Sequence, residues 1–370
     1  MVNITTVKAP AAGIYPQGLF RNNRGDYYET ISWFPEIQSV FEPDTVYKAV
    51  YVLEPISAGY FDNTKIDEIG GINPNGVTDK TAAKNGSNLI IEITFEKTGS
   101  QKAQFHEFEN TLFYDNFDGD ALDLHKWQDP VHYQHDRQGN SKWEPRNVSV
   151  NNGILRLRFA KENEDNNFIT ASAIRSKGQF ENTYGYYEAK IKYPNRSGAW
   201  GAFWLYNECV GRNANNGGVA GGVDGTEIDI IELSTIHLGG SNSALHWDGY
   251  GELHGGYGKD GTYRPGDYAC SNTEAGLYDG KWHIYALEWT PFEYIVYIDG
   301  KVMWRITNTD LAGVGSGICQ NPLYIKLSTE SSAPTNGDDW NMGWGGPVDP
   351  GVWEEAMEVD YVVVYDRPKC

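Results

Sequence analysis

Three carboxylates stand within six residues near the middle of the chain, in the segment Glu227-Ile-Asp-Ile-Ile-Glu232. The isoleucines are β-branched, which favours a β-strand. Side chains alternate between the two faces of a strand, so Glu227 and Asp229 share one face while Glu232 has the opposite parity. A β-bulge at Ile230-Ile231 adds one residue and brings all three carboxylates to one surface.

The reach of this strand indicates which chemistry its acids could do. With one bulge and about 3.3 Å of rise per residue, the backbones of Glu227 and Glu232 lie roughly 13–15 Å apart. Side chains that lean inward leave the two carboxyl groups about 5–6 Å apart, close to the separation of about 5–5.5 Å found in retaining glycosidases. Spacing alone leaves two interpretations open: a glycosidase site, or a solvated acidic strand face.

The composition narrows the classes of partner. The 370 residues carry a formal net charge of −20, and 14% of them are aromatic. Binding nucleic acid or an anionic membrane requires basic patches, so neither is expected as a partner, and anionic substrates are disfavoured. Tyr and Trp rings stack well on the apolar faces of sugars. The composition therefore favours a neutral polysaccharide as partner.

Neither the cysteines nor the hydropathy pattern indicates a metal centre or a membrane span. The four cysteines (Cys209, Cys270, Cys319 and Cys370) show no CxxC pair or metal-ligand spacing. No apolar run is long enough for a transmembrane helix, and residues 1–20 lack the pattern of a signal peptide.

The elements that must position the acids are β-strands. Short β-rich runs alternate with Gly, Asn and Asp turns, which predicts an all-β protein. Residues 1–100 are predicted to form a small Ig-like β-sandwich, an accessory module that acts as a spacer, a docking unit or a sugar-binding unit. Residues 101–111 are a linker. Residues 112–370 contain about ten or more strands, which favours two curved sheets packed face to face as a β-jelly-roll sandwich.

The order of landmarks in the second unit resembles the family 16 glycoside hydrolases over residues 112–367. These landmarks are Phe117-Asp-Gly119, Tyr184-Gly185, Trp200-Gly-Ala-Phe-Trp204, the acid strand, Trp282-His-Ile-Tyr-Ala-Leu-Glu-Trp289 and Val359-Asp-Tyr-Val362. The first unit resembles the small Ig-like modules of bacterial surface proteins and polysaccharidases. The resemblance implies a jelly roll with a cleft across its concave sheet, in a secreted or cell-surface bacterial enzyme.

The same resemblance assigns roles to individual residues. Glu227 would be the nucleophile, Asp229 an assisting acid and Glu232 the general acid/base, with no cofactor needed for catalysis. The residues expected to bind substrate are Trp200, His246, Trp247, Arg175, Trp340 and Trp344. Many relatives carry a structural calcium ion on the convex side, and Asp360 matches one ligand position. Asn116 stands where an acidic residue is usual, which weakens such a site.

The acid strand also bears on the substrate. Its E-x-D-x-x-E form is typical, within the family, of laminarinase-like enzymes and of enzymes that act on galactans. Together with the acidic charge, it favours β-1,3-glucan as the principal substrate and mixed-linkage β-1,3-1,4-glucan as a secondary one. We therefore expect an endo-acting retaining hydrolase of these glucans, and we expect it to be a monomer. Two alternatives stay open: a hydrolase of a galactan such as agarose or carrageenan, and a non-catalytic glycan-binding adhesion protein.

Overall fold

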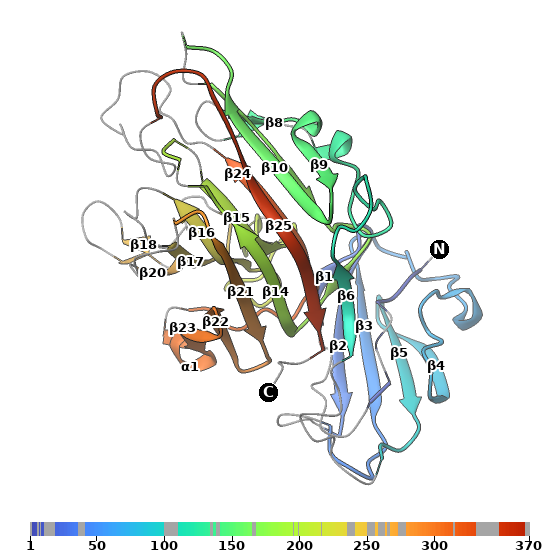
Figure 1. The fold of residues 1–370 in the computed structure, drawn as a ribbon. Helices are drawn as coiled ribbons and strands as arrows, with labels where there is room; N and C mark the ends of the chain where they lie inside the picture. The colour runs from blue at the N-terminus through green and yellow to red at the C-terminus, as the bar shows by residue number, and fades with distance from the viewer. Residues whose placement is uncertain are drawn as a thin grey trace.

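The computed structural model of the chain describes most of both predicted units (Figure 1). The described residues are 2–5, 7, 9–10, 19–35, 41–99, 110–133, 136–137, 141–164, 168–194, 196–198, 200–215, 217–234, 241–249, 256–257, 263–264, 267–272, 279–313, 315–330 and 348–366.

The first unit is an antiparallel sheet of five strands in the order β1-β2-β3-β5-β4. The strands are β1 (Leu19–Asn23), β2 (Tyr27–Phe34), β3 (Lys48–Pro55), β4 (Val77–Asn85) and β5 (Asn88–Phe95), and a 3₁₀ turn, η1, spans Ile66–Glu68. Strands β2, β3 and β5 bury alternate residues, as the period-two pattern predicts. A second sheet is not found among the described residues of this unit, so its Ig-like character stays a prediction.

The second unit contains two large sheets. The larger runs in the order β23-β22-β21-β14-β25-β10-β11-β8-β7, with β6 beside β25 and β9 beside β10. Its strands are β6 (Thr111–Asp115), β7 (Asp136–Arg137), β8 (Ser141–Trp143), β9 (Val148–Asn151), β10 (Ile154–Lys161), β11 (Ile169–Ala171), β14 (Gly185–Lys192), β21 (Trp282–Trp289), β22 (Glu293–Ile298), β23 (Lys301–Thr307) and β25 (Trp353–Tyr365).

The smaller sheet carries the acid strand and runs in the order β12-β24-β15-β16-β17-β20, with β13 beside β24. Its strands are β12 (Ala173–Arg175), β13 (Glu181–Asn182), β15 (Trp200–Tyr206), β16 (Glu227–Ser234), β17 (Ser241–His246), β20 (Asp267–Asn272) and β24 (Leu323–Glu330). A separate hairpin joins β18 (Gly256–Tyr257) and β19 (Tyr263–Arg264), and the helical turns are η2 (Pro130–Tyr133), η3 (Pro145–Asn147) and α1 (Asn308–Gly313).

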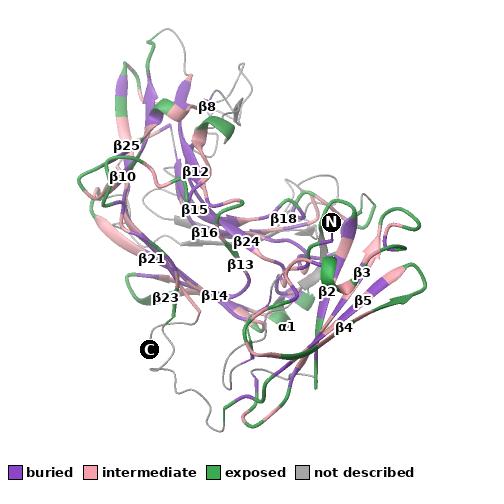
Figure 2. Cartoon of the chain, turned by 90° about the vertical axis from the view of Figure 1, so that its right-hand side faces the viewer, coloured by how far each residue is buried: buried purple, intermediate pink, exposed green. Residues whose placement is uncertain are grey.

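One apolar core lies between the two sheets. The smaller sheet contributes Phe203 and Ile231, and the larger contributes Leu157, Ile191 and Leu287; all five are 0% exposed. Figure 2 shows this burial along the inner strands of both sheets. The predicted all-β sandwich is therefore confirmed. The first unit has its own core, built around residues such as Tyr51 and Ile91.

Turn chemistry fixes the hairpin between β9 and β10. Asn152 and Gly153 have φ angles of 54° and 74°, in the left-handed region that a tight two-residue hairpin turn requires. The register pairs Asn151 with Ile154 across this turn. The sequence Asn151-Asn152-Gly153 is a strong signal for such a turn, and the structure has the turn at this place.

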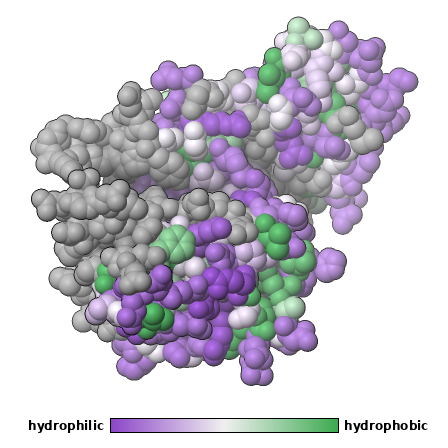
Figure 3. Space-filling model, turned by 90° about the horizontal axis from the view of Figure 1, so that it is seen from above, coloured by the Kyte–Doolittle hydropathy of each residue, from purple (hydrophilic) through white to green (hydrophobic). Residues whose placement is uncertain are grey.

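The two units touch through at least one hydrogen bond, from the Tyr28 hydroxyl of β2 to the carbonyl oxygen of Gly217, at 3.2 Å. Gly217 belongs to the glycine-rich loop that precedes the acid strand. The described part of the surface in Figure 3 is mostly hydrophilic, with apolar side chains in small groups. Among the described residues, no helix is long and apolar enough to cross a membrane.

Candidate active site

Strand β16 contains the predicted bulge. In its pairing with β15, Ile231 lies opposite Phe203 and Asp229 lies opposite Trp204, so Ile230 is the extra residue. The pairing with β17 shifts register over the same stretch. Glu232 lies opposite Ala202, which has the same parity as Trp204. Asp229 and Glu232 therefore face the same side of the sheet, and Glu227 joins them because it lies two residues before Asp229.

A buried serine on the neighbouring strand holds the bulge. The Ser243 hydroxyl donates a 2.8 Å hydrogen bond to the carbonyl oxygen of Ile230. The extra residue of a bulge falls out of the regular ladder, and a buried carbonyl without a partner is costly. Ser243, itself 6% exposed, meets that need at the residue that aligns the acids.

The central acid is the most deeply buried of the three. Asp229 is 4% exposed, whereas Glu227 and Glu232 are half-buried. Burial, followed by the negative charge of Glu227, raises the pKa of Asp229 from 3.8 to about 6, while His246 and Lys326 act in the opposite direction. Asp229 can therefore hold a proton in mildly acidic solution and share it with its neighbours.

His246 lies where the sequence predicted, beside the acids. It is paired with Glu227 across β16 and β17, and its Nε2 is 3.2 Å from Oδ2 of Asp229. Ligand atoms of Glu227, Asp229 and His246 all lie within 4.8 Å of one another, and no other group among the described residues is arranged to hold a metal ion. Within this group, Nε2 of His246 and Oδ2 of Asp229 make the direct contact.

The glycine-rich loop before β16 is tied down by hydrogen bonds. The amide of Gly221 donates to Oδ2 of Asp248 at 2.9 Å, and the amide of Gly222 donates to Oγ of Ser316 at 2.8 Å. Gly225 stands two residues before Glu227. A Cβ atom there would lie 2.5 Å from Oδ1 of Asn207, closer than real contacts allow. This tight packing fixes the entry of the chain into the acid strand.

Sequence reasoning missed a buried cation on the acid-bearing face. Lys326 of β24 is paired with Trp204 of β15, which is itself paired with Asp229. Lys326 is 4% exposed, and its Nζ is 3.4 Å from the ring centroid of Trp204 and 5.0 Å from that of Tyr206. Strand parity could have found it, because Leu327 beside it belongs to the core.

Arg175, a predicted binding residue, lies next to this lysine. The two are paired across β12 and β24, and the Arg175 guanidinium lies 5.9 Å from the ring centroid of Tyr324. The structure thus places two cationic side chains side by side on the sheet that carries the acids. Neither contact was visible in the sequence, because β12 and β24 are far apart along the chain.

The predicted tryptophans have different positions. Trp200 has the same parity as Trp204 and lies on the acid-bearing face, although it is only 6% exposed. Trp247 is 1% exposed and belongs to the core between the sheets, which contradicts its predicted stacking role. The physical reason is strand alternation, because His246 faces the acids and its neighbour must face the other way. Trp340 and Trp344 lie outside the described residues.

The residues near Asp360 do not fit the calcium site that the resemblance implied. Oδ2 of Asp360 accepts a 2.7 Å hydrogen bond from Nζ of Lys190, so an ammonium group already compensates its charge. Lys190 also lies 5.5 Å from the ring centroid of Trp282. Asp360 belongs to no metal-competent group among the residues that the structure describes. This ion pair disfavours Asp360 as a calcium ligand, and the calcium site stays a prediction.

Comparison with known proteins shows the family of the second unit. A family model described as "Beta-porphyranase A-D, GH16 domain" matches residues 109–366. A beta-glucanase of Rhodothermus marinus is 25% identical over 284 residues, covering 75% of this chain and 92% of the relative. A keratan-sulfate endo-1,4-beta-galactosidase of Sphingobacterium multivorum is 25% identical, covering 59% and 45% respectively.

The fold has a counterpart among solved structures. The laminarinase catalytic domain of Thermotoga maritima MSB8 superposes with a TM-score of 0.51 at 20% identity, covering 71% of this chain and all of that domain. At this level of identity, the likeness shows a shared fold and leaves the substrate open.

Proposed function

Because the chain belongs to the family 16 glycoside hydrolases, we propose that it is an endo-acting retaining hydrolase of β-1,3-glucan, with mixed-linkage β-1,3-1,4-glucan as a secondary substrate. The observation that carries the retaining mechanism is the bulge at Ile230, which brings Glu227, Asp229 and Glu232 to one face of the sheet. A solvated acidic strand would not need such an irregularity, nor a buried serine to hold it.

The proposed reaction has two displacements. In the first, the Glu227 carboxylate attacks the anomeric carbon while Glu232 donates its proton to the departing glycosidic oxygen, which leaves a covalent glycosyl ester on Glu227. In the second, Glu232 takes a proton from a water molecule whose oxygen attacks the same carbon. This step releases Glu227 and restores the proton on Glu232. The product keeps the β configuration.

Asp229 and His246 stabilise the changing charge of the acid cluster during this reaction. Two carboxyl groups so close to each other cannot both ionise freely, so a proton shared between Asp229 and Glu227 lowers the repulsion in the resting enzyme. When Glu227 becomes an ester, its negative charge disappears and Asp229 can ionise fully. His246, 3.2 Å from Oδ2 of Asp229, then stabilises the charge on that carboxylate.

Three observations favour a neutral β-glucan. The formal net charge of −20 repels anionic polymers. Aromatic side chains, including Trp200, Trp204 and Tyr206, lie on the acid-bearing face. The relative from Rhodothermus marinus, of which this chain spans 92%, is named a beta-glucanase. We propose that the enzyme acts as a monomer outside a bacterial cell, where such polymers occur.

One observation favours a second candidate, a hydrolase of an anionic galactan. Lys326 and Arg175 lie side by side, two and three strands from the acid strand, and they provide the local positive charge that a sulfated sugar would need. The matching family model is named for β-porphyranases, and one relative is named for keratan sulfate. Against this candidate, Lys326 is 4% exposed and is enclosed by aromatic rings.

A substrate panel tests both candidates. Laminarin, barley glucan, agarose, porphyran and carrageenan are compared at one enzyme concentration by reducing-sugar release, with Glu227→Gln as the inactive control. We expect laminarin to be cleaved fastest. Cleavage of porphyran or carrageenan with laminarin left intact would select the second candidate. Proton NMR of the first product should show the β-anomer, whereas the α-anomer would rule out the retaining mechanism.

A further inference from the structure

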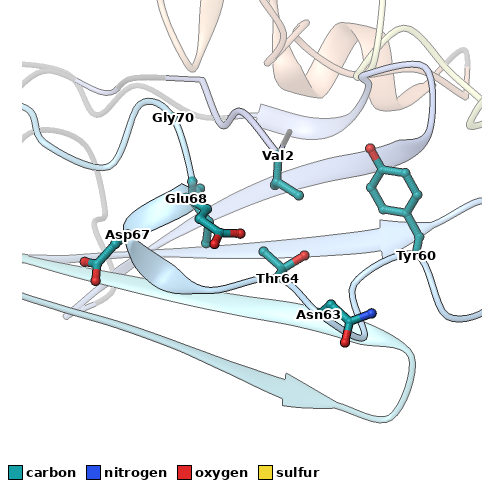
Figure 4. Close-up of a pocket in the computed structure, with 8 residues that line it drawn as sticks. Val2, Tyr60, Asn63, Thr64, Asp67, Glu68 and Gly70 are labelled. Carbon is teal, nitrogen blue, oxygen red and sulfur yellow. The ribbon is translucent and has the colours of Figure 1, made fainter.

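A pocket of about 800 Å³ lies in the first unit, which contributes no residue to the acid cluster (Figure 4). Its lining includes Val2, Tyr60, Asn63, Thr64, Asp67 and Glu68. The volume falls within the range of roughly 300–1,000 Å³ that is usual for ligand sites. Figure 4 shows Tyr60 on one side, Glu68 on the other, and Val2 and Thr64 between them.

Tyr60 is an anchored aromatic platform at this pocket. Its hydroxyl donates to Oδ2 of Asp26 at 3.2 Å. Its ring lies 5.0 Å from that of Phe61 in an edge contact and 5.8 Å from that of Tyr27. The side chain nevertheless remains partly exposed. A tyrosine held at its tip and along its ring loses little conformational entropy when a ligand stacks on it.

The rest of the lining combines an apolar base with short polar groups. Val2 is buried, and Thr64 is half-buried beside it. Asn63 and Glu68 are exposed, so the amide and the carboxylate are available to solvent or to a ligand. These groups suit a sugar ring: the aromatic side chain can stack on it, and the amide, hydroxyl and carboxylate can hydrogen-bond to its hydroxyl groups. Carboxylates accept hydrogen bonds from sugar hydroxyls, and the aromatic face covers the C–H side.

The charge of the lining selects among ligands. Asp67 and Glu68 would repel sulfate, phosphate and carboxylate groups. A metal ion is not favoured either, because these two acids belong to no group of converging ligands among the described residues. We therefore propose that this pocket binds a neutral polysaccharide chain, and that the first unit holds the enzyme on the polymer that the second unit cleaves.

Such a second site works through effective concentration. Once one unit is bound, the other meets the same polymer at a high local concentration, and overall retention exceeds that of either site alone. The inference shares the class of neutral polysaccharide with the proposed function, but it does not depend on which linkage is cut. Binding and hydrolysis can therefore be tested separately.

The test uses the full chain with Glu227→Gln, so that the polymer is not consumed. Affinity electrophoresis uses gels that contain laminarin, barley glucan, agarose or carrageenan. It compares Tyr60→Ala with Phe34→Ala, and Glu68→Gln with Glu96→Gln. Phe34, at the end of β2, is 57% exposed, and Glu96, just after β5, is also exposed. Neither residue lines the pocket, so both serve as matched controls.

We expect Tyr60→Ala to weaken affinity for at least one neutral polymer about tenfold, the loss typical of a central aromatic anchor. Glu68→Gln should weaken it severalfold, with both controls unchanged. If Tyr60→Ala does not fold, Asn63→Ala replaces it. Asn63 is exposed, so its loss should leave the fold intact and should also weaken retention in the gel. Equal retention of pocket and control variants on every neutral polymer would overturn the inference, as would a Tyr60-dependent preference for carrageenan. Failure to cleave laminarin, with Tyr60-dependent binding intact, would refute the proposed function alone.

Discussion

Nε2 of His246 lies 3.2 Å from Oδ2 of Asp229, and the two residues reach each other from neighbouring antiparallel strands. The most buried acid of the cluster therefore has a partner that can bear positive charge. This contact, together with Lys326 on the other side of the acid strand, limits how far burial can raise the pKa of Asp229. Asp229 can therefore change between its ionised and protonated forms near pH 6.

Replacing Asp229 should change stability in a pH-dependent way. The folded pKa of about 6 exceeds the ordinary value of 3.8, so the protonated carboxyl stabilises the fold below about pH 4, and that contribution disappears as pH rises through about 6. Asp229→Asn should therefore gain up to about 3 kcal/mol in unfolding free energy, relative to wild type, between about pH 4 and pH 8. Urea unfolding at both pH values measures this. The same difference from wild type at both would show that the carboxyl titrates normally.

Glu232 and Glu227 should differ in their sensitivity to the leaving group. Glu232→Gln removes the proton donor, which should slow cleavage of polysaccharide by about 10²–10⁴-fold. An aryl glycoside with an acidic phenol needs no such proton, so its first step should be slowed far less. Glu227→Gln should lose activity on both substrates. Equal losses of the two variants on the aryl glycoside would refute the assigned roles.

The serine that holds the bulge should matter for activity as well as for stability. Ser243→Ala leaves the Ile230 carbonyl without its hydroxyl donor, which should cost about 1–3 kcal/mol and let the acids shift. Ser172→Ala is the matched control, because its hydroxyl also donates to a backbone carbonyl, that of Arg158, and its side chain is also buried. We expect similar losses in melting temperature and a loss of kcat only for Ser243→Ala. Unchanged kcat in both would show that the bulge does not depend on this bond.

Lys326 should affect the pH profile of the enzyme. Lys326→Met removes a cation that favours the ionised state of Asp229. The acidic limb of kcat/KM should therefore move to higher pH. Lys326→Arg keeps the charge and should restore most of the profile. Lys190→Met, which removes a lysine paired with Asp360 on the other sheet, serves as the control. A profile that does not move would assign Lys326 to packing against Trp204 alone.

The first unit should be dispensable for short soluble substrates. Its core is separate from that of the second unit, and its Tyr28–Gly217 hydrogen bond is exposed. A chain that begins at Lys102 should therefore cleave soluble oligosaccharides at nearly the full rate and lose activity mainly on insoluble polymer. Loss of activity on oligosaccharides by a folded truncation would mean that the Tyr28 contact supports the loop before β16.

Much of the site could be predicted from local rules. Period-two alternation and the need for shared parity were enough to place the bulge at Ile230, and the Asn-Asn-Gly signal placed the turn between β9 and β10. The same parity rule was not applied to His246 and Trp247, although neighbours in one strand cannot both face the acids. Strand β4 offers no clear hydrophobic alternation to local rules, because most of its residues are polar and exposed, as suits an edge strand.

Other features depend on partners that are distant in the sequence. Asp360 and Lys190 are 170 positions apart, so no local pattern shows that an ammonium group meets this carboxylate. Arg175 and Lys326 become neighbours only through the pairing of β12 with β24. These two contacts depend on long-range strand pairing, so no local pattern could have shown them.

Strand β25, from Trp353 to Tyr365, has a consequence for the order in which the protein forms. It lies near the end of the chain, yet it pairs with β14 along one edge and with β10 and then β6 along the other. The larger sheet cannot close until these 13 residues have left the ribosome. The first unit, whose strands all come from residues 19–95, has no such delay. The five-stranded sheet can therefore be complete before β25 is synthesised, whereas the larger sheet of the second unit cannot.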